Sequence, residues 1–148
     1  MTKEFKELLF RHYFFNNCNT LLKEFGLTKQ ESMFLIITYN LSKADNNVCL
    51  KEIREKMEMS KPSISILMSK LEKKGYIERH LNKQNLREIY VRLSEYSMKI
   101  AEKTIKEINN HLNKIIDKLG NGNVEKLIEL NNLFDKTSKE ILEEGKTC

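Results

Sequence analysis

The sequence has little of the material that makes tight turns, with one proline and five glycines among 148 residues. Glutamate, lysine, leucine and isoleucine dominate instead, which favours a mainly helical protein. No apolar run approaches the roughly 20 residues that a helix needs to span a bilayer. The N-terminus carries acids among its bases, which argues against a signal peptide. We therefore expect one globular, mainly helical chain with no membrane segment.

Cysteine is also scarce. The three cysteines, Cys18, Cys49 and Cys148, lie far apart and are odd in number. This pattern excludes a disulfide framework and favours the reducing cytoplasm. We interpret Cys18 and Cys49 as small buried hydrophobes and Cys148 as incidental.

Residues for catalysis or metal binding do not cluster either. The three histidines, His12, His80 and His111, have no Cys, Asp or Glu at ligand spacing, so we expect no metal and no cofactor. No nucleophile–base pair, glycine-rich phosphate loop or paired carboxylate stands out. The sequence therefore does not favour an enzyme.

What the sequence does have is a basic segment. Between Ser60 and Arg92 lie eight of the 26 bases but only three of the 21 acids, which leaves 18 of each elsewhere. This one segment therefore carries the whole surplus of five positive charges. Such a surface favours a polyanion or a membrane surface as partner, although a charge run can also be a solvated face without one.

The apolar spacing predicts the order of the elements. We expect a helix over 3–25, a second from the capping box at Thr28 to Leu41, a short strand at 48–50 and a short helix over 51–57. A helix over 60–74, two strands within 76–80 and 87–93, a long helix from Ser94 and a last helix after 120–123 follow. The expected fold is all-α with a small β-hairpin, a helix-turn-helix followed by a wing.

The helix that begins at Ser60 has two different faces. Ile64, Leu67, Met68 and Leu71 fall on one stripe that should pack inward. The opposite face is polar and consists of Pro62, Ser63, Ser65, Ile66, Ser69, Lys70 and Lys73. Short hydroxyls allow a close approach and lysines neutralise phosphates, so this face fits a DNA major groove. The alternative is an ordinary solvated helix, which the neighbouring short helix and basic hairpin make less favourable.

Here the chain resembles a known family. The segment from Leu50 to Ser94 is similar to the winged helix-turn-helix of MarR-type bacterial transcription regulators, through "SKPSISILMSKLEKKGYIER", "NKQNLR" and "VRLSEYS". The flanking helices match as well, so the resemblance covers nearly the whole chain. It implies a cytoplasmic homodimer that binds a pseudo-palindromic operator in double-stranded DNA, and a repressor that a small ligand or oxidant releases.

The resemblance also implies roles for individual residues. The recognition helix would meet the major groove and its phosphates through Lys61, Ser63, Ser65, Ile66, Ser69, Lys70 and Lys73. The wing would reach the minor groove through Lys83, Gln84, Asn85 and Arg87.

The chain departs from the family pattern at two positions. Asn85 stands where the family usually has an aspartate that pairs with the wing arginine, so we expect that ion pair to be missing or replaced by a neutral hydrogen bond. Ile66 stands where the family usually has an arginine. Isoleucine can touch a thymine methyl but cannot read guanine, which predicts an A·T-rich operator. Packing of Ile66 against the wing or a neighbouring helix is an equal alternative.

The resemblance divides the chain into N-terminal helices (1–47), a DNA-binding segment (48–93) and C-terminal helices (94–148). The first and last helices would form the dimer through Phe5, Leu8, Leu112, Ile116, Leu119, Leu127, Leu130 and Phe134. A pocket for a lipophilic or phenolic effector would include Tyr13, Cys18 and Tyr39, although helical aromatics are more often core.

A second class of function stays open at this point. A winged helical module can also bind an acidic protein through a basic face. Salt-sensitive binding to such a protein, with no preference among DNA sequences, would distinguish it from a DNA-binding regulator.

Overall fold

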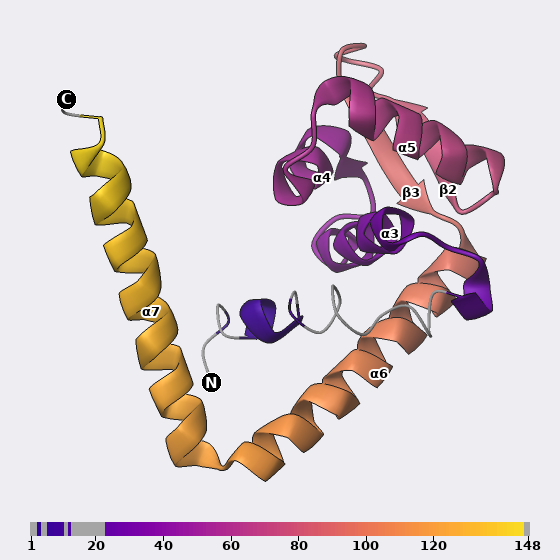
Figure 1. Cartoon of the computed structure of the whole chain (residues 1–148). Coiled ribbons are helices and arrows are strands. Elements are labelled where there is room, and N and C mark those ends of the chain that lie inside the picture. The colour runs from indigo at the N-terminus through magenta and orange to yellow at the C-terminus, as the bar shows by residue number, and fades with distance from the viewer. Residues whose placement is uncertain (1–2, 4–5, 11, 13–22, 147–148) are drawn as a thin grey trace. The chain divides into compact units, whose positions relative to one another are not determined.

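The computed structural model describes residues 3, 6–10, 12 and 23–146 (Figure 1). The chain forms two compact units: Tyr13–Glu107, here called the winged unit, and Met1–His12 together with Ile108–Cys148. The helix expected over 3–25 lies partly outside the described residues, and residues 6–10 and 23–25 of it are helical. The predicted division at 47 and 93 stays a prediction.

Helix α3 (Lys29–Ser42) begins with the predicted capping box. The Glu31 amide donates to Thr28 Oγ1 at 3.2 Å, and the Thr28 amide donates to Glu31 Oε2 at 3.1 Å. These bonds satisfy two amides near the start of the helix that have no partner within it. Phe34 and Leu35 follow and are almost completely buried. The prediction of a central, buried helix is therefore confirmed.

The helix-turn-helix consists of α4 (Leu50–Met57) and α5 (Lys61–Lys73). Ile53 on α4 is fully buried, whereas Met57, which was expected to be buried too, is only half-buried. Between the helices, Glu58 takes a left-handed conformation with φ of 54°, which few residues other than glycine adopt. The Ser63 amide donates to Ser60 Oγ at 3.3 Å, which confirms Ser60 as the cap of α5.

The inward stripe predicted on α5 forms part of the core of the winged unit. Leu71 on this stripe is fully buried, and its neighbours on the stripe are at most 5% exposed. The stripe belongs to one cluster of buried side chains that includes Phe34, Ile53, Ile64, Leu67, Met68, Leu71, Ile77 and Val91. This packing fixes which face of α5 is left outside.

The wing is part of an antiparallel sheet with the order β1-β3-β2. It contains β1 (Val48–Cys49), β2 (Ile77–Leu81) and β3 (Ile89–Leu93), so the short strand expected at 48–50 becomes a third strand beside the hairpin. Val91 pairs with Val48 on one side and with Arg79 on the other. The predicted two-residue alternation therefore places Val91 at the buried centre of the sheet.

Both ends of the hairpin meet at one carbonyl. The Ser94 amide and the Ser97 hydroxyl donate to the Tyr76 carbonyl at 2.9 Å and 2.6 Å. Ser97 is fully buried, and its amide donates to Ser94 Oγ at 3.2 Å. The wing is thus anchored where α6 (Glu95–Leu119) begins.

The last two helices differ from the winged unit in how much they bury. On the stripe predicted for α6, Ile108 and Leu112 are buried, but Leu119 is 41% exposed. Gly120, with φ of 78°, separates α6 from α7 (Asn121–Glu144), where Val124 is buried. None of the helices in the described part of the chain combines the length and apolarity of a membrane span.

Candidate nucleic-acid interface

The outward face of α5 presents the residues that were expected on it. The exposed members are Lys61, Pro62, Ser63, Ser65, Ile66, Lys70 and Lys73, whereas Ser69 is half-buried. Because the opposite stripe is locked in the core, this face cannot rotate inward without emptying that core. The structure therefore brings the predicted recognition residues onto one surface.

Ile66 stands out from this surface. It is 59% exposed, so the alternative that it packs against the wing or a neighbouring helix is wrong for most of its side chain. It lines a shallow depression of about 230 Å³ together with Gln30, Met59, Ser63, Leu67 and Lys70. Gln30 comes from the start of α3 and was not expected here, because nothing in the sequence indicates that α3 begins beside α5.

The wing loop, residues 82–88 between β2 and β3, is stiffened by side-chain hydrogen bonds. Asn85 Oδ1 accepts from the Arg87 amide at 3.2 Å, so the expected side-chain ion pair is replaced by a bond to the backbone. Asn82 Nδ2 donates to Glu88 Oε2 at 2.9 Å, and the Tyr90 hydroxyl donates to the same oxygen at 3.2 Å. The hydrogen bond to Glu88, with a smaller effect of burial, raises the pKa of Tyr90.

Arg79 connects the wing to α5. Its Nη2 lies 3.2 Å from Glu72 Oε2 and donates to Ser69 Oγ at 3.5 Å. Arg79 belongs to β2 and its two partners belong to α5, so the bonds fix the wing relative to the recognition helix. The sequence analysis counted Arg79 among the bases of the basic segment but did not predict these contacts with α5.

An ion pair holds the end of α5 on the start of α3. Lys74 Nζ lies 2.9 Å from Glu31 Oε1 and 3.0 Å from Glu31 Oε2. The Glu31 carboxylate is 4% exposed and the Lys74 side chain 42% exposed, so the acid is the buried partner. Such a buried carboxylate needs its cation, because the desolvation of a lone charge is costly.

The charges of the basic segment thus divide into two groups. Lys74 and Arg79 form ion pairs, and Arg92 Nε donates to Asn47 Oδ1 at 2.8 Å. Within the part of the chain that the structure describes, no carboxylate lies within ion-pair distance of the other five cations, Lys61, Lys70, Lys73, Lys83 and Arg87. All five lie on the exposed face of α5 or on the wing loop.

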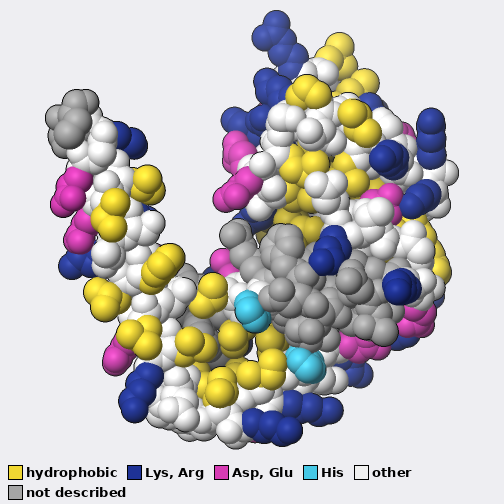
Figure 2. All heavy atoms as spheres, viewed as in Figure 1, with side chains coloured by type: hydrophobic (Ala, Val, Ile, Leu, Met, Phe, Trp, Pro, Cys, Tyr) yellow, Lys and Arg dark blue, Asp and Glu magenta, His cyan; other side chains and the backbone are white. Residues whose placement is uncertain are grey.

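Figure 2 shows Lys and Arg side chains at the end of the winged unit that carries the wing loop in Figure 1, next to hydrophobic side chains. The segment's three acids are engaged with neighbours: Glu72 with Arg79, Glu78 with His80, and Glu88 with Asn82 and Tyr90. The surplus positive charge is therefore concentrated on one surface that can neutralise a polyanion.

The expected effector residues are described only in part. Tyr13 and Cys18 lie outside the described residues. The Tyr39 hydroxyl donates to Glu102 Oε1 at 3.1 Å, and Lys43 Nζ lies 4.9 Å from the centre of the Tyr39 ring. Burial raises the pKa of Tyr39, and the hydrogen bond to Glu102 raises it further. Tyr39 thus links α3 to α6, and its role in an effector pocket stays a prediction.

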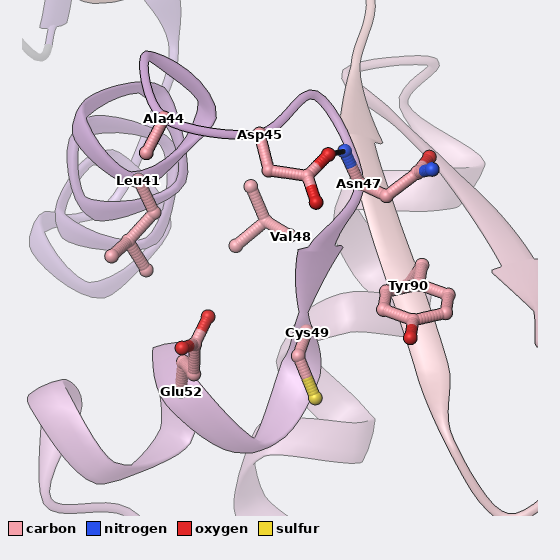
Figure 3. Close-up of a pocket in the computed structure, with 8 residues that line it drawn as sticks. All are labelled: Leu41, Ala44, Asp45, Asn47, Val48, Cys49, Glu52 and Tyr90. Atoms are coloured by element: carbon pink, nitrogen blue, oxygen red, sulfur yellow. Dashed lines mark hydrogen bonds between the residues drawn. The ribbon is translucent and has the colours of Figure 1, made fainter.

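A separate cleft of about 300 Å³ lies where α3, β1 and α4 meet (Figure 3). Its lining includes Cys49, which is half-buried rather than buried as expected. Within the cleft Asp45 Oδ1 accepts from the Asn47 amide at 3.0 Å. The described residues contain no group of three His, Cys, Asp or Glu side chains placed to hold a metal ion.

The residues expected to form a dimer are mostly accessible. Leu112 is buried, and Leu8 and Ile116 are half-buried, whereas Phe5 lies outside the described residues. The remaining four are exposed: Leu119 (41%), Leu127 (40%), Leu130 (63%) and Phe134 (72%). Contiguous exposed apolar residues of this kind are typical of a surface that another chain covers.

The chain resembles known proteins in sequence and in fold. Residues 17–104 match the family described as transcriptional regulator SarA/Rot. No curated protein matches the chain.

Several solved structures have the same fold. MepR of Staphylococcus aureus in a complex with DNA is 19% identical, with a TM-score of 0.70 over 94% of this chain and 98% of that one. MepR of the same organism in a DNA-binding conformation has a TM-score of 0.67 at 18% identity, over 93% and 98%. AbsC, a MarR-family regulator of Streptomyces coelicolor, has a TM-score of 0.66 at 19% identity, over 93% and 87%.

Proposed function

Since the chain belongs to the SarA/Rot family of transcriptional regulators, we propose that it binds an operator in double-stranded DNA as a homodimer. Helix α5 enters the major groove, and the wing lies along the adjacent minor groove. The observation that carries this proposal is the division of the charges. The five cations without an ion-pair partner among the described residues are those of the α5 face and the wing loop.

The contacts to phosphate and to bases come from different residues. Lys61, Lys70 and Lys73 on α5 neutralise phosphates, as do Lys83 and Arg87 on the wing. Ser65 and Ile66 face the base edges, with a hydroxyl that suits several bases and an aliphatic side chain that suits a thymine methyl. The exposure of Ile66 supports an A·T-rich operator.

Dimerisation sets the spacing of the two recognition helices. The exposed leucines and Phe134 of α7 supply an apolar surface for a second copy of the chain. Two copies related by a two-fold axis read half-sites about one turn of DNA, or about 34 Å, apart. The protein acts in the cytoplasm as a repressor, and a small ligand or oxidant releases it by changing this spacing.

Binding to the DNA upstream of the protein's own gene, and to a scrambled duplex, tests the proposal across a salt series. The logarithm of the affinity falls by about 0.9 per phosphate contact for each tenfold rise in salt. Lys70→Ala removes one contact per subunit, so its slope is shallower by about 1.8 for the dimer. Ser65→Ala lowers the preference for the upstream DNA and leaves the slope unchanged.

Lys99→Ala is the matched control, because Lys99 is also exposed but lies on α6, 3.4 Å from Glu95. It should bind as the wild type does. Weak, equal binding to both duplexes would overturn the proposal. The basic surface would then belong to a module that binds an acidic protein.

A further inference from the structure

The tip of the wing carries a leucine. Leu86 lies in the loop 82–88 between β2 and β3 and is 73% exposed. Among the large hydrophobic side chains that the structure describes, no other is as exposed. Leu86 is not part of the buried cluster of the winged unit.

The loop is built so that this leucine stays outside. The Asn82 amide donates to the Glu88 carbonyl at 3.1 Å, which closes the base of the loop. The Gln84 amide donates to Asn82 Oδ1 at 2.9 Å, and the Arg87 amide to Asn85 Oδ1 at 3.2 Å. The two asparagines thus turn inward to hold the backbone. Leu86 takes part in none of these bonds, and its side chain is left exposed.

The neighbours of Leu86 are cations. Lys83 and Arg87 in the same loop are exposed, and no described carboxylate lies within ion-pair distance of either. A single exposed leucine elsewhere on a protein needs no explanation. Here the leucine stands between two cations in the sequence of one loop, and such cations attract phosphates. Proteins that bind the minor groove frequently combine Arg and Lys contacts with an apolar side chain, leucine among them, that is inserted between base pairs.

We propose that Leu86 is a wedge that enters one base step in the minor groove and kinks the duplex. The proposal rests on the proposed function, because it requires the wing to lie at the minor groove. Pyrimidine–purine steps unstack most easily, so the wedge selects such a step at a fixed distance from the major-groove half-site. The wedge thus gives a preference for easily deformed DNA, in addition to the preference for thymine that Ile66 gives.

The wedge and the cations should respond differently to mutation. Leu86→Ala removes an apolar contact and no charge, so it lowers the affinity about tenfold and leaves the salt slope unchanged. Lys83→Ala removes a phosphate contact, so it lowers the slope and leaves the kink intact. Leu86→Met keeps an apolar side chain of similar volume and should keep the kink.

The test places 2-aminopurine, whose fluorescence rises on unstacking, at each pyrimidine–purine step of the upstream duplex in turn. Energy transfer between dyes at the two ends of the same duplex reports the bend. We expect wild type, Leu86→Met and Lys83→Ala to raise the fluorescence at one step per half-site and to shorten the end-to-end distance. Leu86→Ala should do neither.

The outcomes separate this proposal from the proposed function. Selective binding by wild type and Leu86→Ala with the same fluorescence and bend overturns the wedge and leaves the regulator intact. Equal binding of wild type to upstream and scrambled DNA overturns both. A third result also overturns the wedge. In it, wild type binds vesicles that contain an anionic lipid, and Leu86→Ala no longer binds them but binds DNA as the wild type does. Leu86 would then be a membrane contact.

Discussion

Helices α5 and α7 are both amphipathic, yet their apolar faces lie in opposite environments. On α5 the stripe of Ile64, Leu67, Met68 and Leu71 is at most 5% exposed. On α7, Leu130, Leu133 and Phe134 are 63%, 59% and 72% exposed. The spacing of the apolar residues thus predicts, for both segments, a helix and the side of the helix that is apolar. What covers that side depends on partners that the spacing does not specify.

The difference separates two ways of stabilising a helix. Side chains from α3, α4 and the sheet cover α5, so its stability comes from the same chain. An isolated helix gains little from its own hydrogen bonds, and most helices depend on packing of their apolar face. The apolar face of helix α7 has no such cover among the described residues, and in the proposed dimer a second copy of the chain would cover it.

Leu71→Ala should produce the largest effect, because it opens a cavity in the core of the winged unit. We expect the free energy of unfolding to fall by about 2–5 kcal/mol. Urea unfolding followed by circular dichroism measures this loss. Leu133→Ala removes the same atoms from α7, and in the dilute, dissociated protein it should change the stability by less than about 0.5 kcal/mol. Equal losses would mean that α7 is covered within its own chain.

Leu130→Ser combined with Phe134→Ser should weaken the dimer without unfolding the subunit. Apolar anchors at the centre of an interface contribute about 2 kcal/mol or more each, so the dissociation constant should rise at least about 100-fold. Sedimentation equilibrium across a range of protein concentrations measures this change. Asp135→Ser on the same helix is the control and should leave the constant unchanged. A wild-type chain that stays monomeric throughout would overturn the dimer.

Lys74→Met tests how α5 is held on α3. It leaves the Glu31 carboxylate buried with only the Thr28 amide as a described partner. A fully buried pair broken in this way loses about 3–5 kcal/mol, but Lys74 is partly solvated, so we expect about 1–2 kcal/mol.

The double variant Glu31→Gln with Lys74→Met removes both charges and should recover most of that loss. Urea unfolding of the two variants side by side measures the recovery. If Lys74→Met alone matched the wild type, water would be solvating Glu31 in place of the lysine.

The sequence predicted local features well because their causes are local. The capping box at Thr28, the cap at Ser60 and the stripe on α5 all depend on residues within one or two turns of each other. The sequence also singled out the five cations that have no ion-pair partner among the described residues, and their role as DNA contacts stays a prediction.

The pairing of the other bases could not be predicted. Lys74 and Glu31 are 43 residues apart, and Arg79 meets Ser69 and Glu72 from a different element. Such contacts depend on how elements pack, which no spacing encodes. The same reason explains why Gln30 beside Ile66 was missed.

Tyr39→Phe should have the smallest effect of these variants. It tests how far along α6 the helix is packed within its own chain, as α5 is, before the exposed region that includes α7 begins. Tyr39 on α3 donates a hydrogen bond to Glu102 on α6. The first half of α6 is therefore packed against other elements of the same chain. Burial, and then the bond to Glu102, raises the pKa of Tyr39 above the ordinary value of about 10. A raised pKa means that the folded state favours the neutral phenol. The resulting stability is complete below about pH 10 and is lost as the pH rises through the folded-state pKa.

This largely solvated bond should contribute at most about 0.5 kcal/mol. Urea unfolding of wild type and Tyr39→Phe between pH 8 and 11 should show a difference that disappears at the alkaline end. Tyr96→Phe is the control, because its ring stacks on Tyr76 with centroids 5.9 Å apart and its hydroxyl forms no hydrogen bond among the described residues. A pH-independent difference would mean that the phenol contributes by packing alone. The hydrogen bond to Glu102 would then not be what holds α6 against α3.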